Sequence, residues 1–251
     1  MTAERSDRER YILDLLSQDG ALSVTALSRD LGVSEVTIRT HLRNLEQQGL
    51  LSRTWGGAKP VSIQNVLDRV KNQEREKERI AQTAAGMVQD GDRIMIEAGT
   101  TTALVPRFLT GKRGIQIVTN SLLVLNYARA NPELDVILTG GDFHRESESL
   151  VGPVAAATIR RFNARVAFVG TDGFTADRGI TTQFAQGAEV IEAMMARAEE
   201  VWLLADHTKY GRAGFVSVIE MNELSGVIVD SGLSKESIKV LKSSAPQALV
   251  V

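Results

Sequence analysis

Residues 33–48, VSEVTIRTHLRNLEQQ, place guanidinium, hydroxyl and amide side chains at helical spacing. At about 100° per residue, Ile38, Leu42 and Leu45 fall on one face of a helix and the polar groups fall opposite. Guanidinium groups bind guanine edges and phosphates, amides bind adenine, and hydroxyls bind phosphate. The pattern favours contact with DNA, and the side chains that we expect to make it are Ser34, Val36, Thr37, Arg39, Thr40, Arg43 and Asn44.

A second set of polar residues follows β-rich runs later in the chain. The run RIMIE (93–97) ends in Glu97 and leads into a glycine and three threonines before the helical stretch ALVPRFL. Glycine and hydroxyls at a helix N-terminus favour an anion, and ligands of open α/β sheets bind at the carboxyl ends of the strands. We expect a phosphate on residues 99–102, with Lys209 neutralising its charge. The predicted ligand-binding residues are Glu97, Gly99, Thr100, Thr101, Thr102, Asn120, Ser121, Gly140, Gly141, Asp172, Gly173 and Lys209.

The composition is that of a globular protein and narrows the classes of site. The 251 residues are 43% hydrophobic and 24% charged, with a formal net charge of -2, so no overall basic field indicates nucleic acid. The chain has no cysteine and three histidines that lack metal-ligand spacing, and we expect no metal and no cofactor. No signal peptide and no apolar run of the ~20 residues that span a bilayer are present. We therefore expect a cytoplasmic protein without membrane contact.

The elements that position the first set are three short helices and a hairpin. Helical spacing predicts helices over residues 6–18, after Ser23, and from Ser34 to about residue 48, with a tight turn at Gly32. The run LLSRTWGGAKP (50–60) predicts a hairpin. A helix-turn-helix followed by a hairpin is a winged DNA reader, in which Arg53 and Lys59 would contact the phosphate backbone. The same spacing also fits a packing or dimerisation domain.

The elements that position the second set are alternating strands and helices. The β-rich runs are RIMIE (93–97), IQIVT (115–119), DVILT (135–139), ARVAFVG (164–170), VWLLAD (201–206) and GVIVD (226–230). Nearly continuous apolar strands that alternate with helices predict a parallel sheet covered on both faces. We predict a winged helix-turn-helix domain over residues 1–60, a solvated helical linker over residues 61–80 and an α/β domain over residues 81–251.

Residues 33–58, VSEVTIRTHLRNLEQQGLLSRTWGGA, resemble the amino-terminal signature of the DeoR-type bacterial transcription regulators. That signature is a VS-x-x-TIRRDL helix followed by LE-x-x-G-x-L-x-R-x-x-GGA. Two positions depart from it, because Thr40 stands where the family usually has arginine and His41 where it has aspartate. The family's motifs D-x-GTT, TN, GG, G-x-DG and D-x-(S/T)-K align with the later polar clusters, with Glu97 in place of the usual aspartate.

The resemblance implies a DNA-binding repressor of a carbohydrate-utilisation operon. Its α/β domain would be a Rossmann-like sensor, similar in fold to ribose-5-phosphate isomerase and CoA transferases. A phosphorylated sugar or sugar alcohol would bind the sensor and release the double-stranded operator. Because two-fold operators mirror two-fold proteins, we expect a homo-oligomer, either a dimer or a tetramer.

An enzymatic alternative follows from the same fold relationship. In the related enzymes a carboxylate is a proton-transfer base or a nucleophile toward CoA thioesters. Glu97 is the candidate, with Asp172 or Asp177 as the second group of a sugar-phosphate isomerase or a CoA-transferase-like enzyme. The isomerases carry a glycine-rich lysine loop where this chain has residues 177–182, and an isomerase needs no fused DNA reader. We therefore expect no catalytic residues.

Overall fold

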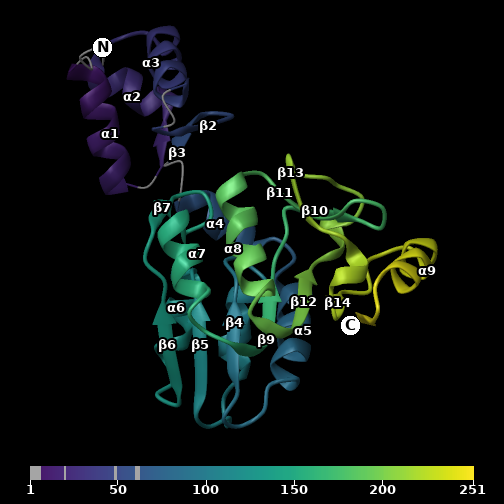
Figure 1. The fold of residues 1–251 in the computed structure, drawn as a ribbon. Helices are drawn as coiled ribbons and strands as arrows, with labels where there is room; N and C mark the ends of the chain where they lie inside the picture. The colour runs from purple at the N-terminus through teal and green to yellow at the C-terminus, as the bar shows by residue number, and fades with distance from the viewer. Residues whose placement is uncertain (1–6, 20, 48–49, 60–62) are drawn as a thin grey trace. The chain divides into compact units, whose positions relative to one another are not determined.

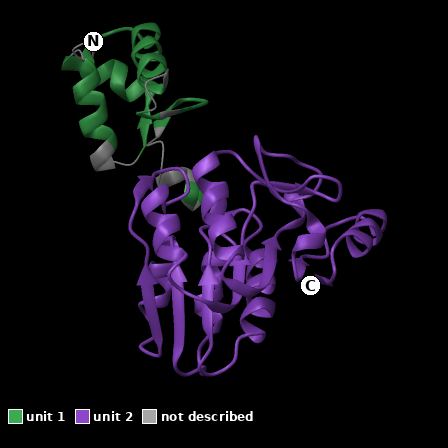
Figure 2. Cartoon of the chain, in the orientation of Figure 1, with its two compact units in different colours: residues 1–68 green, residues 69–251 purple. Residues whose placement is uncertain are grey.

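The computed structural model describes residues 7–19, 21–47, 50–59 and 63–251, which form two compact units (Figures 1 and 2). Residues 1–68 make up the first unit and residues 69–251 the second. The predicted linker, residues 61–80, spans this division, and its first two residues lie outside the described ranges. The linker is helical as two separate helices, α4 (Ile63–Lys71) and α5 (Glu74–Gly86).

The first unit is a helix-turn-helix with a small sheet. Its helices are α1 (Asp7–Asp19), α2 (Val24–Leu31) and α3 (Glu35–Gln47), and its strands β1 (Leu22–Ser23), β2 (Ser52–Thr54) and β3 (Gly57–Lys59) pair in the order β1-β3-β2. Ser23 caps α2 by accepting a hydrogen bond from the N–H of Ala26, and Gly32 ends that helix at a φ of 63°. The core consists of apolar residues of this unit alone, among them Ile12, Leu27, Ile38, Leu42, Leu45 and Leu51.

The second unit is built on a parallel sheet of seven strands within the described residues. The strands are β4 (Arg93–Ile96), β5 (Ile115–Thr119), β6 (Leu134–Leu138), β9 (Ala164–Val169), β12 (Ala198–Ala205), β14 (Gly226–Val229) and β15 (Ala248–Val250). Their order is β15-β14-β12-β9-β4-β5-β6, and Figure 1 shows most of it from β6 across to β14. The chain starts in the middle at β4, builds outward to β6, and then returns to β9 on the other side of β4. This reversal creates a switch point between β4 and β9, and it confirms the predicted Rossmann-like α/β class.

Alternating residues of each strand face two separate helical layers. In β4, Ile94 and Ile96 pack with α5, the 3₁₀ helix η1 (Thr102–Phe108) and α6 (Leu122–Ala128), whereas Met95 packs with α7 (Pro153–Ile159) and α8 (Ala185–Met195). The helix α9 (Lys235–Ser244) belongs to the second layer through Leu241. Both faces of the sheet are therefore covered, as the apolar runs predict.

The segment after β4 differs from its prediction. We expect an α-helix whose N-terminus binds an anion, but η1 is a 3₁₀ helix with Pro106 inside it. Proline has no backbone N–H and clashes with the preceding turn, so a regular α-helix cannot run through this position. A 3₁₀ helix also begins with backbone N–H groups that are free of intrahelical bonds, so the predicted phosphate contact at residues 99–102 stays a prediction.

Shorter elements follow the carboxyl ends of the sheet strands. After β6 comes the hairpin of β7 (Asp142–His144) and β8 (Ser149–Val151). After β9 come β10 (Gly173–Thr175) and β11 (Gly179–Thr182), which form a small sheet with β13 (Val216–Ile219) in the order β10-β11-β13. The 3₁₀ turn η2 (His207–Lys209) follows β12, and η3 (Met221–Glu223) precedes β14.

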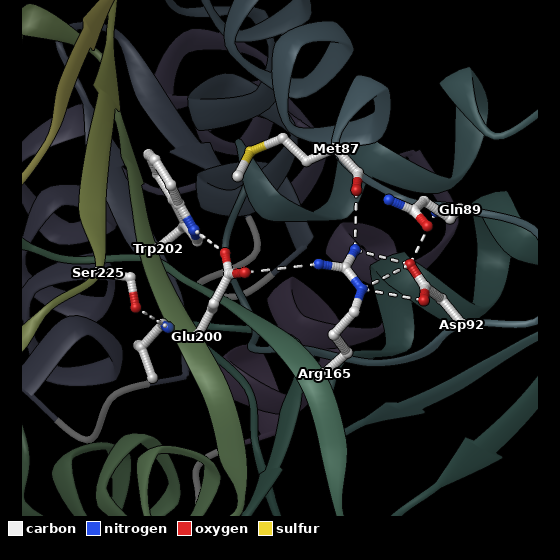
Figure 3. A network of polar contacts seen from close by, with 8 residues as sticks. Met87, Gln89, Asp92, Arg165, Glu200, Trp202 and Ser225 are labelled. Atoms are coloured by element: carbon white, nitrogen blue, oxygen red, sulfur yellow. Dashed lines mark hydrogen bonds and ion pairs between the residues drawn. The ribbon is translucent and has the colours of Figure 1, made fainter.

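A polar network ties the amino ends of three strands together (Figure 3). Arg165, in β9, donates hydrogen bonds to both carboxylate oxygens of Asp92 at 2.6–2.9 Å and to the carbonyl of Met87 at 2.8 Å. It also pairs with Glu200 of β12 at 3.7 Å, and Glu200 accepts a hydrogen bond from the indole N–H of Trp202. The network lies at the end of the sheet away from the switch-point loops and is structural.

Candidate functional site

The exposed surface of α3 carries the residues predicted to contact DNA. Ser34 begins the helix by accepting a hydrogen bond from the N–H of Thr37 at 3.2 Å. Thr40 donates through Oγ1 to the carbonyl of Val36 at 3.0 Å, and Arg39 lies 3.5 Å from Glu35. The side chains of Ser34, Val36, Arg39, Thr40, Arg43 and Asn44 are exposed and that of Thr37 is half-buried. The structure thus presents these residues together on the second helix of a helix-turn-helix.

The departure at His41 falls on another face of the helix. The imidazole Nδ1 lies 3.4 Å from Glu9 of α1, and the side chains of both residues are mostly buried. His41 therefore joins α3 to α1 and lies off the surface that carries Arg43.

The β2–β3 hairpin forms the wing, and one of its two predicted DNA-contacting residues is tied to α3. Arg53 donates to the carboxylate of Glu46 through Nε at 2.6 Å and through its backbone N–H at 3.0 Å. These hydrogen bonds hold the pKa of Glu46 below its ordinary value and tie Arg53 to α3. Lys59 lies in β3, but its side chain is outside the part of the structure that is described. Trp55, at the turn of the hairpin, is fully exposed. The sequence alone does not show whether this side chain is exposed or packed against the wing.

A cavity of about 300 Å³ lies at the switch point of the second unit. Parallel α/β sheets bind ligands at this location, because the loops that follow the two diverging strands separate there. The predicted residues that line it are Glu97, Gly99, Thr100, Thr101, Thr102, Asn120, Asp172 and Lys209. Strands far apart in the sequence thus bring most of the predicted polar clusters to one place.

The remaining predicted residues of this set shape the walls and do not line the cavity. Ser121 caps α6 by accepting from the N–H of Val124. Gly140 and Gly141 lie beside α7, and a Cβ on Gly141 would come within 2.5 Å of the Val151 carbonyl. Gly173 is in β10 against the backbone of Arg212. These four residues support the loops around the cavity, and their predicted contact with a ligand stays a prediction.

Glu97 is a buried acid of the cavity lining. It follows β4, is 8% exposed, and its Oε2 accepts a hydrogen bond from the N–H of Gly170 at 3.0 Å across the switch point. Burial raises the pKa of Glu97 to about 8, and the charge of Asp172 adds to this effect. At neutral pH Glu97 therefore carries a proton, and its carboxyl group both donates and accepts hydrogen bonds.

Two other predicted residues are engaged by the backbone. The amide of Asn120 accepts from the N–H of Ala98 at 3.0 Å and donates to the carbonyl of Leu150 at 3.1 Å. The hydroxyl of Thr102 donates to the carbonyl of Glu97 at 2.7 Å. Asn120 thus holds the loop after β4 in place, and the Thr102 hydroxyl proton is not directed at a ligand.

A cationic wall that the sequence analysis missed comes from the end of α4 and the start of α5. Lys77 is 3% exposed, and its ammonium group donates to the carbonyls of Arg69 and Asn72. Burial lowers the pKa of Lys77, and the nearby carboxylate of Asp206 opposes this effect. Gln73, at the break between the helices, has a φ of 54°. The sequence signal was available, since Lys77 lies three and four residues before the buried Ile80 and Ala81.

Arg69 contributes a guanidinium group with an unsatisfied donor. Its Nη2 donates to the carbonyl of Glu146 at 2.6 Å, which ties α4 to the β7–β8 loop. Its Nε is buried and has no hydrogen-bond partner among the described residues. A buried N–H without an acceptor is unfavourable, so this wall is suited to a ligand that supplies an oxygen.

The loop after β12 brings Lys209 to the same cavity. Asp206 is buried and accepts from the N–H and the hydroxyl of Thr208. His207 donates its backbone N–H to Asp230 at 2.6 Å, and its ring Nδ1 lies 2.7 Å from the same carboxylate. These contacts fix the η2 turn, and they place Lys209 in the cavity lining.

The β7–β8 loop closes another side of the cavity. His144 stacks on Phe184 with 4.1 Å between ring centroids, and its Nδ1 lies 2.7 Å from the hydroxyl of Ser147. Both rings and Ser147 line the cavity. Among the described residues, no group of three or more acidic or histidine side chains is arranged to hold a metal ion, and no helix has the length and apolar character needed to cross a membrane. The cavity is thus lined by aromatic, hydroxyl and cationic side chains.

Comparison with known proteins identifies both units. Residues 8–64 match the DeoR-like helix-turn-helix domain, and residues 72–231 match the DeoR C terminal sensor domain. The HTH-type transcriptional regulator GlpR of Haloferax volcanii is 35% identical over 95% of this chain and 95% of its own length. The putative aga operon transcriptional repressor of Escherichia coli O157:H7 is 29% identical over 98% of this chain and 94% of its own.

Solved structures share parts of the fold at low identity. Ribose 5 phosphate isomerase A from Neisseria gonorrhoeae covers 55% of this chain and 54% of its own, with 17% identity and a TM-score of 0.39. The translation initiation factor eIF-2B of Pyrococcus horikoshii covers 88% of this chain and 86% of its own, with 16% identity and a TM-score of 0.42. The relatives that match nearly the whole chain are transcription regulators, which disfavours the enzymatic alternative based on Glu97. With both of its domains matched in order, the chain belongs to the DeoR family of DNA-binding transcription regulators.

Proposed function

We propose that this regulator represses a carbohydrate-utilisation operon and leaves its operator when a phosphorylated sugar or sugar alcohol enters the switch-point cavity. One observation carries the proposal: the cavity of about 300 Å³ has a cationic wall on one side and buried groups able to bind hydroxyls on the other. A cavity of this size suits a small ligand. The relatives named as repressors support the direction of the response.

The cationic wall is the proposed phosphate site. Arg69, Lys77 and Lys209 all line the cavity, and the charges of Arg69 and Lys209 influence the titration of Lys77, so the three groups lie close together. A phosphate would supply the acceptor that the Nε of Arg69 lacks. Thr100 and Thr101 add hydroxyl donors on the opposite loop. The proposed phosphate site thus adds side-chain cations to the predicted contacts of residues 99–102.

The acidic side of the cavity is the proposed sugar site. Protonated Glu97 offers a donor and an acceptor, and Asp172 is held by the hydroxyl of Thr182 at 3.1 Å and the N–H of Gln183 at 2.9 Å. Groups fixed in this way discriminate between hydroxyl patterns, because a misplaced hydroxyl leaves a buried polar group unpaired. The longer side chain of Glu97, compared with the aspartate usual in the family, adjusts which sugar fits.

Transmission would pass through α4. Arg69 lies in the last turns of this helix, and the division between the two compact units falls just before it. A ligand changes DNA occupancy only if it favours one arrangement of the protein over another. We propose that a phosphate bound by Arg69 and Lys77 alters the α4–α5 break at Gln73. Hydrogen exchange over residues 63–80 that does not change with a ligand that lowers DNA affinity would contradict this step.

The oligomeric state and the location complete the proposal. We propose a dimer or tetramer acting on a two-fold operator in the cytoplasm. Sedimentation of the full chain, alone and with operator DNA, measures the number of copies. A monomer on DNA would contradict it.

Fluorescence anisotropy on labelled DNA from upstream of the protein's own gene tests the function. A panel of glycerol 3-phosphate, fructose 1-phosphate, fructose 6-phosphate and glucosamine 6-phosphate is titrated against each matching unphosphorylated compound. We expect one phosphate ester to release the DNA and its parent compound to have no effect. Lys209→Ala and Thr101→Val should keep DNA affinity and lose release, whereas Lys239→Ala, on the exposed face of α9, should behave as wild type. Unchanged release by both cavity variants would place the effector elsewhere.

A further inference from the structure

The first turns of α3 carry exposed methyl groups on the surface that faces away from the core. The side chain of Val36 is 73% exposed, although contact of an apolar side chain with water is unfavourable. Thr40 lies one turn later on the same side, and its hydroxyl donates back to the carbonyl of Val36 at 3.0 Å. Because the hydroxyl is turned toward the helix backbone, the methyl group of Thr40 is what this side chain presents outward.

The neighbouring polar groups of these turns are also engaged within the unit. The hydroxyls of Ser34 and Thr37 lie 2.9 Å apart, and the guanidinium of Arg39 lies 3.5 Å from Glu35. Glu35 also accepts from the hydroxyl of Thr25 in α2 at 2.8 Å. The first turns of α3 therefore present methyl groups beside polar atoms that already have partners.

In a helix-turn-helix the amino-terminal residues of the second helix meet the base edges of the major groove. The apolar feature of that groove is the C5-methyl group of thymine. The residue at position 40 decides between two bases. An arginine there would favour guanine, whereas the methyl group of Thr40 cannot bind a guanine edge. We propose that Val36 and Thr40 contact thymine methyl groups, so that each operator half-site carries thymine under the first two turns of α3. This inference depends on the DNA-binding assignment alone and stands whether or not a sugar phosphate is the effector.

Replacing thymine by deoxyuridine in the operator tests the contact directly, because this change removes the methyl group and keeps base pairing. The full-length protein first selects its site from a random-sequence duplex library. Each thymine of the selected site is then replaced in turn, and affinity is measured by anisotropy at fixed salt. We expect about fourfold weaker binding at each contacted position, the factor that burial of one methyl-sized group gives. A selected site in which no thymine is sensitive would overturn the proposal.

Three substitutions assign the methyl contacts to residues. Thr40→Ser keeps the hydroxyl that bonds to the Val36 carbonyl and removes only the methyl group, so it should abolish the difference between thymine and deoxyuridine at one position. Thr40→Val keeps the methyl group and should retain that difference. Val36→Ala should abolish sensitivity at another position. Both sites are exposed, so the core of the unit is unaffected.

The matched control lies on α7 in the second unit, where the same spacing recurs. Val154 is 59% exposed, and the hydroxyl of Thr158 donates to its carbonyl at 2.8 Å. Val154→Ala and Thr158→Ser should leave every ratio of thymine to deoxyuridine affinity unchanged. If Thr40→Ser and Val36→Ala also keep all these ratios, the methyl groups of α3 do not bind thymine and the proposal is wrong.

Discussion

Replacing Glu97 by glutamine should stabilise the ligand-free second unit at neutral and alkaline pH. The carboxyl group is 8% exposed, and burial raises its pKa from 4.5 to about 8. The unfolded chain releases this proton near its ordinary pKa, whereas the folded chain retains it until about pH 8. The folded state therefore binds more protons between these values, and its stability falls as the pH rises through this range. Glutamine has the shape of the protonated acid, can still accept from the Gly170 N–H, and does not titrate.

The magnitude follows from the two pKa values. At pH 7 the retained proton costs the folded wild type roughly 3 kcal/mol, and above pH 8 the cost levels at roughly 5 kcal/mol. Below about pH 4 the carboxyl group of the wild type is mostly protonated in both the folded and the unfolded state, so the stability difference between wild type and Glu97→Gln should vanish. The stability gain of Glu97→Gln should thus grow from nothing in acid to several kcal/mol in alkali.

Urea denaturation between pH 5 and pH 9 measures this difference. The chain has two tryptophans, and Trp202 is buried in the sheet whereas Trp55 is in the other unit. A Trp55→Phe background therefore restricts the fluorescence signal to the unit that contains Glu97. Glu133→Gln, at an exposed position, is the matched control. If Glu97→Gln and its parent lose stability in parallel as the pH rises, Glu97 does not retain its proton in the folded protein and the reasoning fails.

Three further predictions concern the strand network, the cationic wall and the wing. Arg165→Met should cost about 2–3 kcal/mol at pH 7, because it leaves the mostly buried carboxylate of Asp92 without its partner. Burial opposes ionisation of Asp92, but the hydrogen bonds of Arg165 outweigh this effect and lower the pKa of Asp92. The stability cost of Arg165→Met should therefore shrink as Asp92 becomes protonated below about pH 4. Urea titration of a double-mutant cycle with Asp92→Asn measures this cost and its pH dependence, and a cost that persists in acid would refute the prediction. Lys77→Met should raise the effector concentration for half-release at least about tenfold, and an unchanged anisotropy titration would exclude Lys77 from the phosphate site. Trp55→Ala should weaken operator and random DNA alike, by about fivefold, and a loss confined to the operator would mean that the wing reads bases.

Features with a local cause are the ones that the sequence predicts well. The position of α2 and of the turn after it follows from Ser23 as a cap and from Gly32 in the left-handed region. The sequence predicts α3 from Ser34 to about residue 48, and the structure has it over Glu35–Gln47. The parallel sheet follows from apolar runs too continuous for a half-exposed strand. Its strand order needs pairings between distant segments, which no local pattern contains.

Only some of the residues that line the cavity can be predicted from the sequence. Residues directly after strands, such as Glu97 and Asp172, come to the cavity because strand ends converge. Lys77 lies in a run of mixed charges that composition alone indicates is solvated, yet it is buried because α5 packs on the sheet through Ile80. The sequence predicts a helix over residues 102–108, and the structure has a 3₁₀ helix there because Pro106 cannot occupy the interior of a regular α-helix.

The two units have separate hydrophobic cores, and this has a consequence for the history of such proteins. Among the described residues, the buried cluster of the first unit runs from Ile12 to Ala58, and the clusters that pack on the sheet begin at Ile80. Neither interior has to be repacked when the other changes. A DNA-binding unit can therefore be exchanged for a different one at little cost to folding, which would join the same sensor to a new set of promoters.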